Sequence, residues 1–162
     1  MKINFLNTNL KVEDRKVLKE AFKSVLKLLK QPNKIEVNLA FADPEEIKIT
    51  NKQFRGIDKS TDVLSFPAYN FEAGEIVNFD DSKFNLNIDR ETKYFELGDC
   101  LICLEIAQKQ ASEFKHELLY EIIRLFVHSL FHLFGYDHIL DIDYKIMSSL
   151  EEKIMLEFEQ YK

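Results

Sequence analysis

The sequence predicts a single layered domain in which short strands alternate with helices. Its 162 residues suffice for one domain with a substantial core and are too few for two of ordinary size. Apolar residues make up 46% and charged residues 31% of the chain, which is typical of a globular protein. Hydrophobic positions recur with a period of two in some segments and of three to four in others, which indicates an α/β-type layered architecture over residues 1–162.

The first half of the chain predicts strand, helix, strand and helix in that order. Residues 2–7 alternate like a strand, and residues 11–30 have an apolar face opposite a row of lysines. Residues 34–42 form the second strand. The stretch DPEE that follows combines an N-cap, a proline suited to the first turn and two glutamates, so we expect a helix from there to about Gly56.

The second half predicts two more strands and three more helices. Residues 61–67 are a short strand that ends at a proline, and residues 97–106 are a buried strand. Helices follow at about 106–115, 116–134 and 141–160.

Residues 68–96, between these two strands, have little hydrophobic periodicity and many acidic residues. A connection this long is usually a functional flap or carries its own small structure. Its aromatic residues could stack on bases, although we expect most of them to pack the segment onto the body. They are Tyr69, Phe71, Phe79, Phe84, Tyr94 and Phe95.

The two cysteines, Cys100 and Cys103, have the C-x-x-C spacing of metal and redox sites. Their segment has the pattern of a buried strand, in which positions three apart point to opposite faces. A chelating or redox pair would need a turn or a helix start. We therefore predict two core thiols.

The predicted helix 116–134 contains the residues that point most clearly to a functional site. Apolar residues cover nearly its whole circumference, which indicates a buried helix. Polar residues recur every four positions along it, and a buried polar stripe needs partners or lines a cavity. The members of this stripe are Tyr120, Arg124, His128 and His132.

A metal ion is the partner that the histidines indicate. His128 and His132, one turn apart, project from the same face, and Gly135 can turn the chain so that His138 returns beside them. The pattern H-x-x-x-H-x-x-G-x-x-H thus predicts three imidazole ligands and a fourth position left for water, a catalytic arrangement. Zinc is the default for imidazole ligands, and another divalent transition metal is possible. We expect that His116 is not a ligand.

Ser129 stands where a zinc peptidase with this spacing has its glutamate base. A neutral serine cannot act as that base near pH 7. Three neutral imidazoles leave the full charge of the ion in place, which suits an anionic substrate such as a phosphate.

The net charge of −6 is unevenly distributed. Residues 1–60 hold 13 Lys and Arg against 8 Asp and Glu, whereas residues 61–162 hold 9 against 20. This suggests a basic face on an acidic body, or simply lysines that solvate helix faces. No apolar run is long enough to span a membrane, and we expect a cytoplasmic protein without membrane attachment.

At two motifs the sequence resembles the YbeY family of bacterial endoribonucleases, also described as rRNA maturation factors. HSLFHLFGYDH matches the family's histidine motif, NKQFRGIDKSTDVLSFP matches its upstream motif, and GDCLIC matches a family strand. The resemblance covers about residues 47–156. Ser129 replaces a family glycine, Ser60 replaces a proline, and residues 68–96 are longer than the usual connection; none of these departures removes a ligand.

The resemblance implies an α+β, zincin-like fold, with a mixed four-stranded sheet flanked by about five helices. It implies a single-strand-specific, metal-dependent endoribonuclease, usually taken to use zinc, that acts on rRNA of the small ribosomal subunit in 16S rRNA 3′-end maturation and ribosome quality control. By motif matching Arg55 becomes the catalytic arginine. A guanidinium and a metal ion can bind the charge on a phosphodiester from two sides.

Other residues have weaker assignments. Lys48, Lys52 and Lys59 form a basic row with Arg55 that could follow an RNA backbone, or they are an ordinary solvated face. Asp137 either orients a ligand histidine or caps the turn. We expect Arg124 to pair with Glu121 or Glu117.

Two rival functions remain open at this level. A zincin-type metallopeptidase rests on the histidine spacing alone, and the absent glutamate weighs against it. A non-catalytic, metal-stabilised ribosome-assembly factor would explain the metal and the basic half of the chain, but would not need Arg55.

Overall fold

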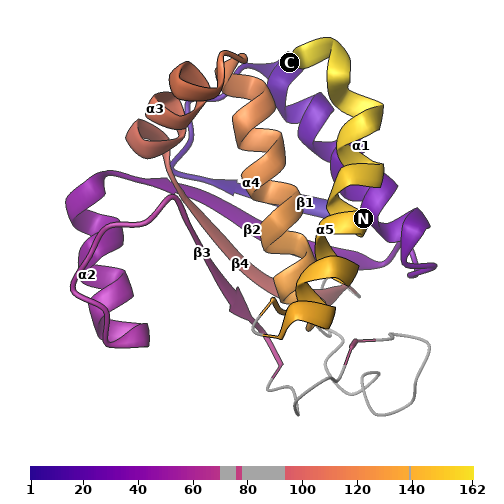
Figure 1. Cartoon of the computed structure of the whole chain (residues 1–162). Helices are drawn as coiled ribbons and strands as arrows, with labels where there is room; N and C mark the ends of the chain where they lie inside the picture. Colours follow the sequence, from indigo (N-terminus) through magenta and orange to yellow (C-terminus); the bar gives the residue numbers. More distant parts are fainter. Residues whose placement is uncertain (70–75, 78–93, 139) are drawn as a thin grey trace.

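The computed structural model describes residues 1–69, 76–77, 94–138 and 140–162, and its centre is one mixed four-stranded sheet (Figure 1). The strand order is β1-β2-β4-β3, with β1, β2 and β4 parallel and β3 antiparallel to β4. The strands are β1 (Lys2–Leu6), β2 (Ile35–Ala42), β3 (Val63–Pro67) and β4 (Phe95–Cys103). This is the mixed four-stranded sheet that the resemblance implied.

Five α helices accompany the sheet in the described part of the chain, also as expected. Helices α1, α3, α4 and α5 gather on one side of it, while α2 stands apart from them (Figure 1). A 3₁₀ helix, Leu156–Tyr161, continues α5. The α helices are α1 (Val12–Leu28), α2 (Pro44–Arg55), α3 (Leu104–Phe114), α4 (Leu118–Leu133) and α5 (Asp141–Met155). None of the helices described is both long and apolar enough to cross a membrane.

Helix α4 runs through the middle of the main core. Leu125, Phe126 and Val127, three consecutive residues that point in different directions, are all at most 1% exposed. The helix has the sheet on one side and α1, α3 and α5 on the others. The prediction of a buried helix is confirmed, and any polar group on α4 must therefore find a partner inside the fold.

Helix α2 begins and ends as its sequence predicts. The Asp43 carboxylate accepts hydrogen bonds from the N–H groups of Glu45 and Glu46, and the Glu46 side chain accepts one from the N–H of Asp43, which completes a capping box. Gly56 ends the helix with φ of 71°, a conformation that glycine adopts without a steric penalty. The helix thereby holds Arg55 at its last position.

The two cysteines lie on opposite faces of β4, as predicted. Cys100 belongs to the main core, whereas Cys103 packs with Ile47 of α2 and Leu64 of β3 in a small second core. Both are free thiols. Burial raises the pKa of Cys100 to about 12. A thiol that resists ionisation is a poor metal ligand and a poor redox group, so both cysteines serve the core.

The described parts of the long connection pack onto the body. Val77 is fully buried, and its N–H donates to the carbonyl of Phe134 at the end of α4 (2.9 Å). Tyr69 is half-buried against the main core and Phe95 is buried within it. These residues agree with the expectation that the aromatic residues anchor the segment. Three others lie outside the described residues: Phe71, Phe79 and Phe84.

Both predicted boundaries of β4 were wrong. Strand β4 begins at Phe95 rather than residue 97, because Phe95 pairs with Ile35 at the start of β2. It ends at Cys103 rather than residue 106, where α3 begins directly. Alternation in a buried strand does not mark its ends, since both faces are apolar.

Candidate functional site

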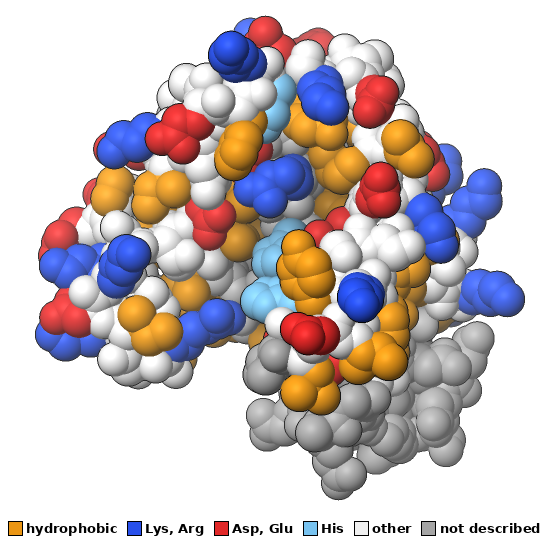
Figure 2. Space-filling view, in the orientation of Figure 1, with side chains coloured by type: hydrophobic (Ala, Val, Ile, Leu, Met, Phe, Trp, Pro, Cys, Tyr) orange, Lys and Arg blue, Asp and Glu red, His pale blue; other side chains and the backbone are white. Residues whose placement is uncertain are grey.

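The three predicted histidines meet at the C-terminal end of α4. His128 and His132 lie one turn apart on the helix, and His138 comes back to them after the chain has turned. One ring nitrogen of each lies within 4.8 Å of those of the other two. The histidines are visible in a hollow between the surface that carries α2 and the surface that carries α5, and basic side chains border it (Figure 2).

The turn after α4 is a Schellman motif. The N–H of Tyr136 donates to the carbonyl of Phe131, and the N–H of Gly135 donates to the carbonyl of His132, both at 3.0 Å. Gly135 has φ of 93°, as the motif requires. The rings of Phe131 and Tyr136, with centroids 5.6 Å apart, supply the hydrophobic contact that accompanies the motif. This turn directs His138 back toward the helix.

Hydrogen bonds on the outer side of two rings orient their inner nitrogens. Nδ1 of His132 lies 3.0 Å from the carbonyl oxygen of Tyr136, and Nδ1 of His128 lies 2.7 Å from Oε1 of Glu151 on α5. A carbonyl oxygen or a carboxylate can only accept, so Nδ1 carries the proton in both rings. In the neutral imidazoles Nε2 then has a free lone pair.

The donor set fits a metal ion. The Nε2 atoms of His128 and His132 are 3.1 Å apart. Two nitrogen lone pairs at this distance repel unless a proton or a metal ion lies between them. A tetrahedral zinc ion with bonds of 2.0–2.1 Å would hold two nitrogens about 3.3 Å apart. The described residues thus offer three nitrogen ligands and no thiolate or carboxylate in the cluster.

Burial keeps the central histidine neutral. The pKa of His132 is lowered from 6.5 to about 4, first by burial and then by the neighbouring imidazoles of His128 and His138. A neutral imidazole is the form that binds a metal. His132 therefore offers the metal-binding form of its ring near pH 7.

The cavity at the histidines is small. It measures about 40 Å³ and is lined by His128 and His138 on one side and by Tyr144, Met147, Ser148 and Glu151 of α5 on the other. It is far below the size of an ordinary ligand pocket. Its lining includes Glu151, on the Nδ1 side of His128, and does not include His132, so the cavity lies beside the histidine cluster, between the cluster and α5.

Ser129 points away from the histidines into the fold. It is fully buried, and its hydroxyl is 2.9 Å from the hydroxyl of Ser65 on β3. The bond joins α4 to the edge strand of the sheet. A glutamate in this orientation would place a charge in the core. Residue 129 therefore does not supply the base that a peptidase with this histidine spacing uses.

Arg55 reaches the same edge strand from the other side. Its Nη2 donates to the carbonyl of Ser65 (3.3 Å), the residue whose side chain contacts Ser129, and the arginine is exposed. This bond takes one of the five N–H donors of the guanidinium. Ser65 of β3 therefore connects Arg55 of α2 to Ser129, the neighbour of His128 on α4.

The basic row is partly neutralised. Nζ of Lys52 lies 2.7 Å and Nζ of Lys48 lies 3.8 Å from the carboxylate of Asp58. The carbonyl of Lys59 accepts a hydrogen bond from the buried side chain of Asn51 (2.7 Å), which fixes the loop after α2. Sequence reasoning missed Asp58, which the turn at the end of α2 brings back beside the lysines.

Asp137 and Glu151 have different contacts at the site. The Asp137 carboxylate accepts from the backbone N–H of His138 (2.7 Å), a contact of the turn-capping kind. The carboxylate that hydrogen-bonds a ring of the histidine cluster is that of Glu151, which sequence reasoning also missed. Glu151 is 23 residues from His128 along the chain, so no local spacing pointed to it.

Arg124 of α4 and His116, which precedes the helix, find partners within the protein. Arg124 donates through Nε (3.0 Å) and Nη2 to the fully buried Glu121, which confirms the pairing expected from the sequence. Nε2 of His116 lies 3.0 Å from the other oxygen of the same carboxylate. His116 is thus outside the histidine cluster, as predicted.

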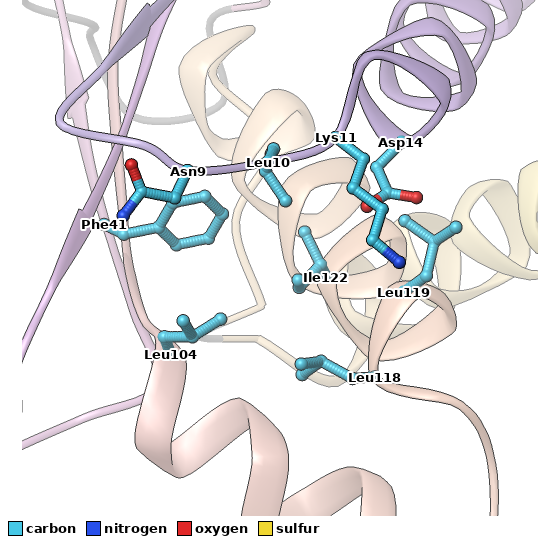
Figure 3. A pocket seen from close by; sticks show the side chains of 9 residues that line it. All are labelled: Asn9, Leu10, Lys11, Asp14, Phe41, Leu104, Leu118, Leu119 and Ile122. Carbon is cyan, nitrogen blue, oxygen red and sulfur yellow. The ribbon is translucent and has the colours of Figure 1, made fainter.

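A larger, mainly apolar pocket lies at the opposite end of α4 (Figure 3). It measures about 400 Å³, and Phe41, Leu104, Leu119 and Ile122 contribute to its walls, with Lys11 at its rim. Leu119 precedes His128 by nine residues, about 14 Å along a helix. Sequence reasoning did not find this pocket, and it is separate from the histidine site.

Comparison with known proteins gives one family. The family model described as Endoribonuclease YbeY matches residues 2–159. A curated relative of that name from Clostridium botulinum is 37% identical over 162 residues, covering 98% of this chain and 95% of the relative. One from Caldanaerobacter subterraneus subsp. tengcongensis is 43% identical over 135 residues, covering 83% and 81%. The solution structure of TM1509 from Thermotoga maritima aligns with a TM-score of 0.60 and 28% identity, covering 95% of this chain and 87% of that one.

Proposed function

The chain belongs to the YbeY family of endoribonucleases, and we propose that it is itself a metal-dependent endoribonuclease whose catalytic domain is residues 1–162. The observation that carries the proposal is the convergence of three histidine nitrogens, with the Nδ1 atoms of His128 and His132 held by Glu151 and the Tyr136 carbonyl. His128, His132 and His138 would hold the ion, and zinc is the metal that best suits three imidazoles.

The ligand set favours a phosphodiester substrate. Three neutral imidazoles do not offset the charge of a divalent ion, so the site attracts an anion. When bound there, the ion would act as a Lewis acid on a phosphate oxygen or as an activator of water. Ser129 adds no base, because its hydroxyl is buried against Ser65. This weighs against peptide hydrolysis, which needs a proton carrier at that position.

We assign to Arg55 the stabilisation of the negative charge that develops on the phosphate in the transition state. Its exposed guanidinium is anchored to β3 by one N–H, and its other donors would bind the non-bridging oxygens of the scissile phosphate. Lys48, Lys52 and Lys59 would contact neighbouring phosphates. The contacts of Lys48 and Lys52 would be weaker, because Asp58 already offsets part of their charge. Asp137 would support His138 through the turn rather than through its ring.

The proposed substrate is single-stranded RNA, specifically rRNA of the small ribosomal subunit during 16S 3′-end maturation and quality control, which would place the activity in the cytoplasm. The alternative is a ribosome-assembly factor that binds RNA without cleaving it. An exposed arginine bound to the strand that packs against the histidine helix favours the enzyme.

Cleavage of end-labelled RNA tests the proposal. Zinc-loaded wild type should cut single-stranded RNA and spare the matching duplex. Arg55→Ala should retain zinc and RNA binding but lose about 10²–10³-fold in rate, as does removal of other oxyanion-stabilising donors, and His132→Ala should lose zinc and activity. Lys109→Ala, purified identically, is a surface control. Equal cleavage by all four proteins would point to a contaminant and favour the assembly factor.

A further inference from the structure

One face of α5 forms a wall of the histidine cavity. Tyr144, Met147, Ser148 and Glu151 all line it, and they are spaced i, i+3, i+4 and i+7, so they follow one another along a single helix face. At one end of this face, Glu151 hydrogen-bonds His128. Met147 is buried in the core and fixes the helix in place. Tyr144 therefore stands at the outer end of a face whose position is set by the site.

Tyr144 is an exposed aromatic at the mouth of this cavity. Its side chain is 60% exposed although it also contributes to the cavity wall, and its carbonyl accepts a hydrogen bond from the Ser148 hydroxyl (2.7 Å). The same half of α5 exposes further large apolar side chains, and hydrophobic groups border the histidines on this side (Figure 2). These are Leu140, Ile142 and Ile146.

We propose that Tyr144 is a stacking platform for an unpaired base of the RNA next to the scissile phosphate. The inference rests on the proposed function and deepens it. A phosphate held at the three histidines leaves its adjacent base outside the cluster, and Tyr144 is an exposed aromatic residue of α5 that lines a small cavity together with His128 and His138. Ring-on-base stacking requires a base that is free of its own neighbours, which a single strand supplies and a duplex does not.

This arrangement predicts selectivity for strandedness without selectivity for sequence. Every base has a π face, so a stacking platform accepts all four. The contact lies beside the reacting phosphate rather than on it, and it is present both in the bound substrate and in the transition state. Its loss should therefore raise KM and leave kcat nearly unchanged. A role in folding would instead lower the melting temperature.

The experiment uses zinc-loaded full-length protein and a labelled single-stranded RNA with one abasic nucleotide moved along it. Tyr144→Ala should raise KM, and the Kd from fluorescence anisotropy, about 5- to 100-fold. Tyr144→Phe should resemble wild type because it keeps the ring. Phe114→Ala, which removes an equally exposed aromatic at the end of α3, is the matched control and should change neither value.

The abasic series gives the decisive comparison. Wild type should lose affinity for the RNA when the missing base lies at one position beside the cleaved bond. The affinity of Tyr144→Ala should not change when the base at that position is missing. Equal losses in both proteins, or an unchanged Kd in Tyr144→Ala, would overturn the inference and leave the apolar rim as a candidate protein contact. If wild type binds RNA but never cuts it, the proposed function fails while the anisotropy series still decides the role of Tyr144; if it binds no RNA, both fail.

Discussion

Removing the Glu151 carboxylate should weaken zinc binding without unfolding the protein. Oε1 of Glu151 lies 2.7 Å from Nδ1 of His128, within the range of a charge-assisted hydrogen bond. This bond fixes the proton on Nδ1 and so presents Nε2 to the ion. Loss of comparable partners costs about 10- to 100-fold in metal affinity, or about 1.4–2.7 kcal/mol. We expect Glu151→Ala near the upper end and Glu151→Gln, which keeps an acceptor oxygen, near the lower end.

The assay is competition for zinc between the chelator-stripped protein and a chromophoric chelator at neutral pH. Glu152→Gln is the control, because this neighbour has the same charge but is exposed and lies outside the cavity lining. Thermal unfolding without zinc checks that each variant folds. If Glu151→Ala binds zinc as tightly as wild type, the argument from the ring hydrogen bond is refuted.

Three further predictions concern stability. In the metal-free protein the pKa of His132 is about 4 in the folded state, against an ordinary value of 6.5. The unfolded chain therefore binds more protons between these two values, and the melting temperature should fall as the pH drops from 6.5 to 4. This pH dependence should be shallower in His132→Gln, and equal slopes in the two proteins would contradict the lowered pKa. Ser129→Glu should cost more than about 3 kcal/mol in urea unfolding, since it buries an unpaired charge, and should create no peptidase; a near-neutral change would show that the site is open to water. Gly98→Ala should destabilise the protein more than Gly56→Ala, which should cost about 1–2 kcal/mol. A Cβ at Gly98 would lie 2.2 Å from the Phe66 carbonyl oxygen, whereas a Cβ at Gly56 would meet no atom within 4 Å. Equal urea-unfolding midpoints for the two variants would refute this.

The sequence was sufficient for features that depend on local spacing. The i, i+4 histidines, the glycine that turns the chain and the capping box of α2 all arise within a few residues, where helix geometry decides which groups meet. The opposite orientation of Cys100 and Cys103 followed from strand alternation in the same way. The mixed four-stranded sheet was expected from the family resemblance alone, and the order of its strands was not predicted, because alternation does not reveal which strands are neighbours.

Contacts between distant elements could not be predicted. Glu151 reaches His128 only because α5 packs beside α4, and nothing in its local pattern separates it from Glu152. The direction of Ser129 depends on the edge strand that supplies Ser65. Asp58 lies beside the lysines because Gly56 reverses the chain. In each case the determining fact is tertiary packing, which single-sequence periodicity does not contain.

The most direct test of the central claim is a zinc titration of RNA cleavage by the chelator-stripped protein. We predict that cleavage returns in proportion to added zinc, stops rising at one equivalent per chain, and does not return in His138→Ala, which leaves the two histidines of α4 intact. Cleavage that persists without metal, or that returns equally in His138→Ala, would contradict the account.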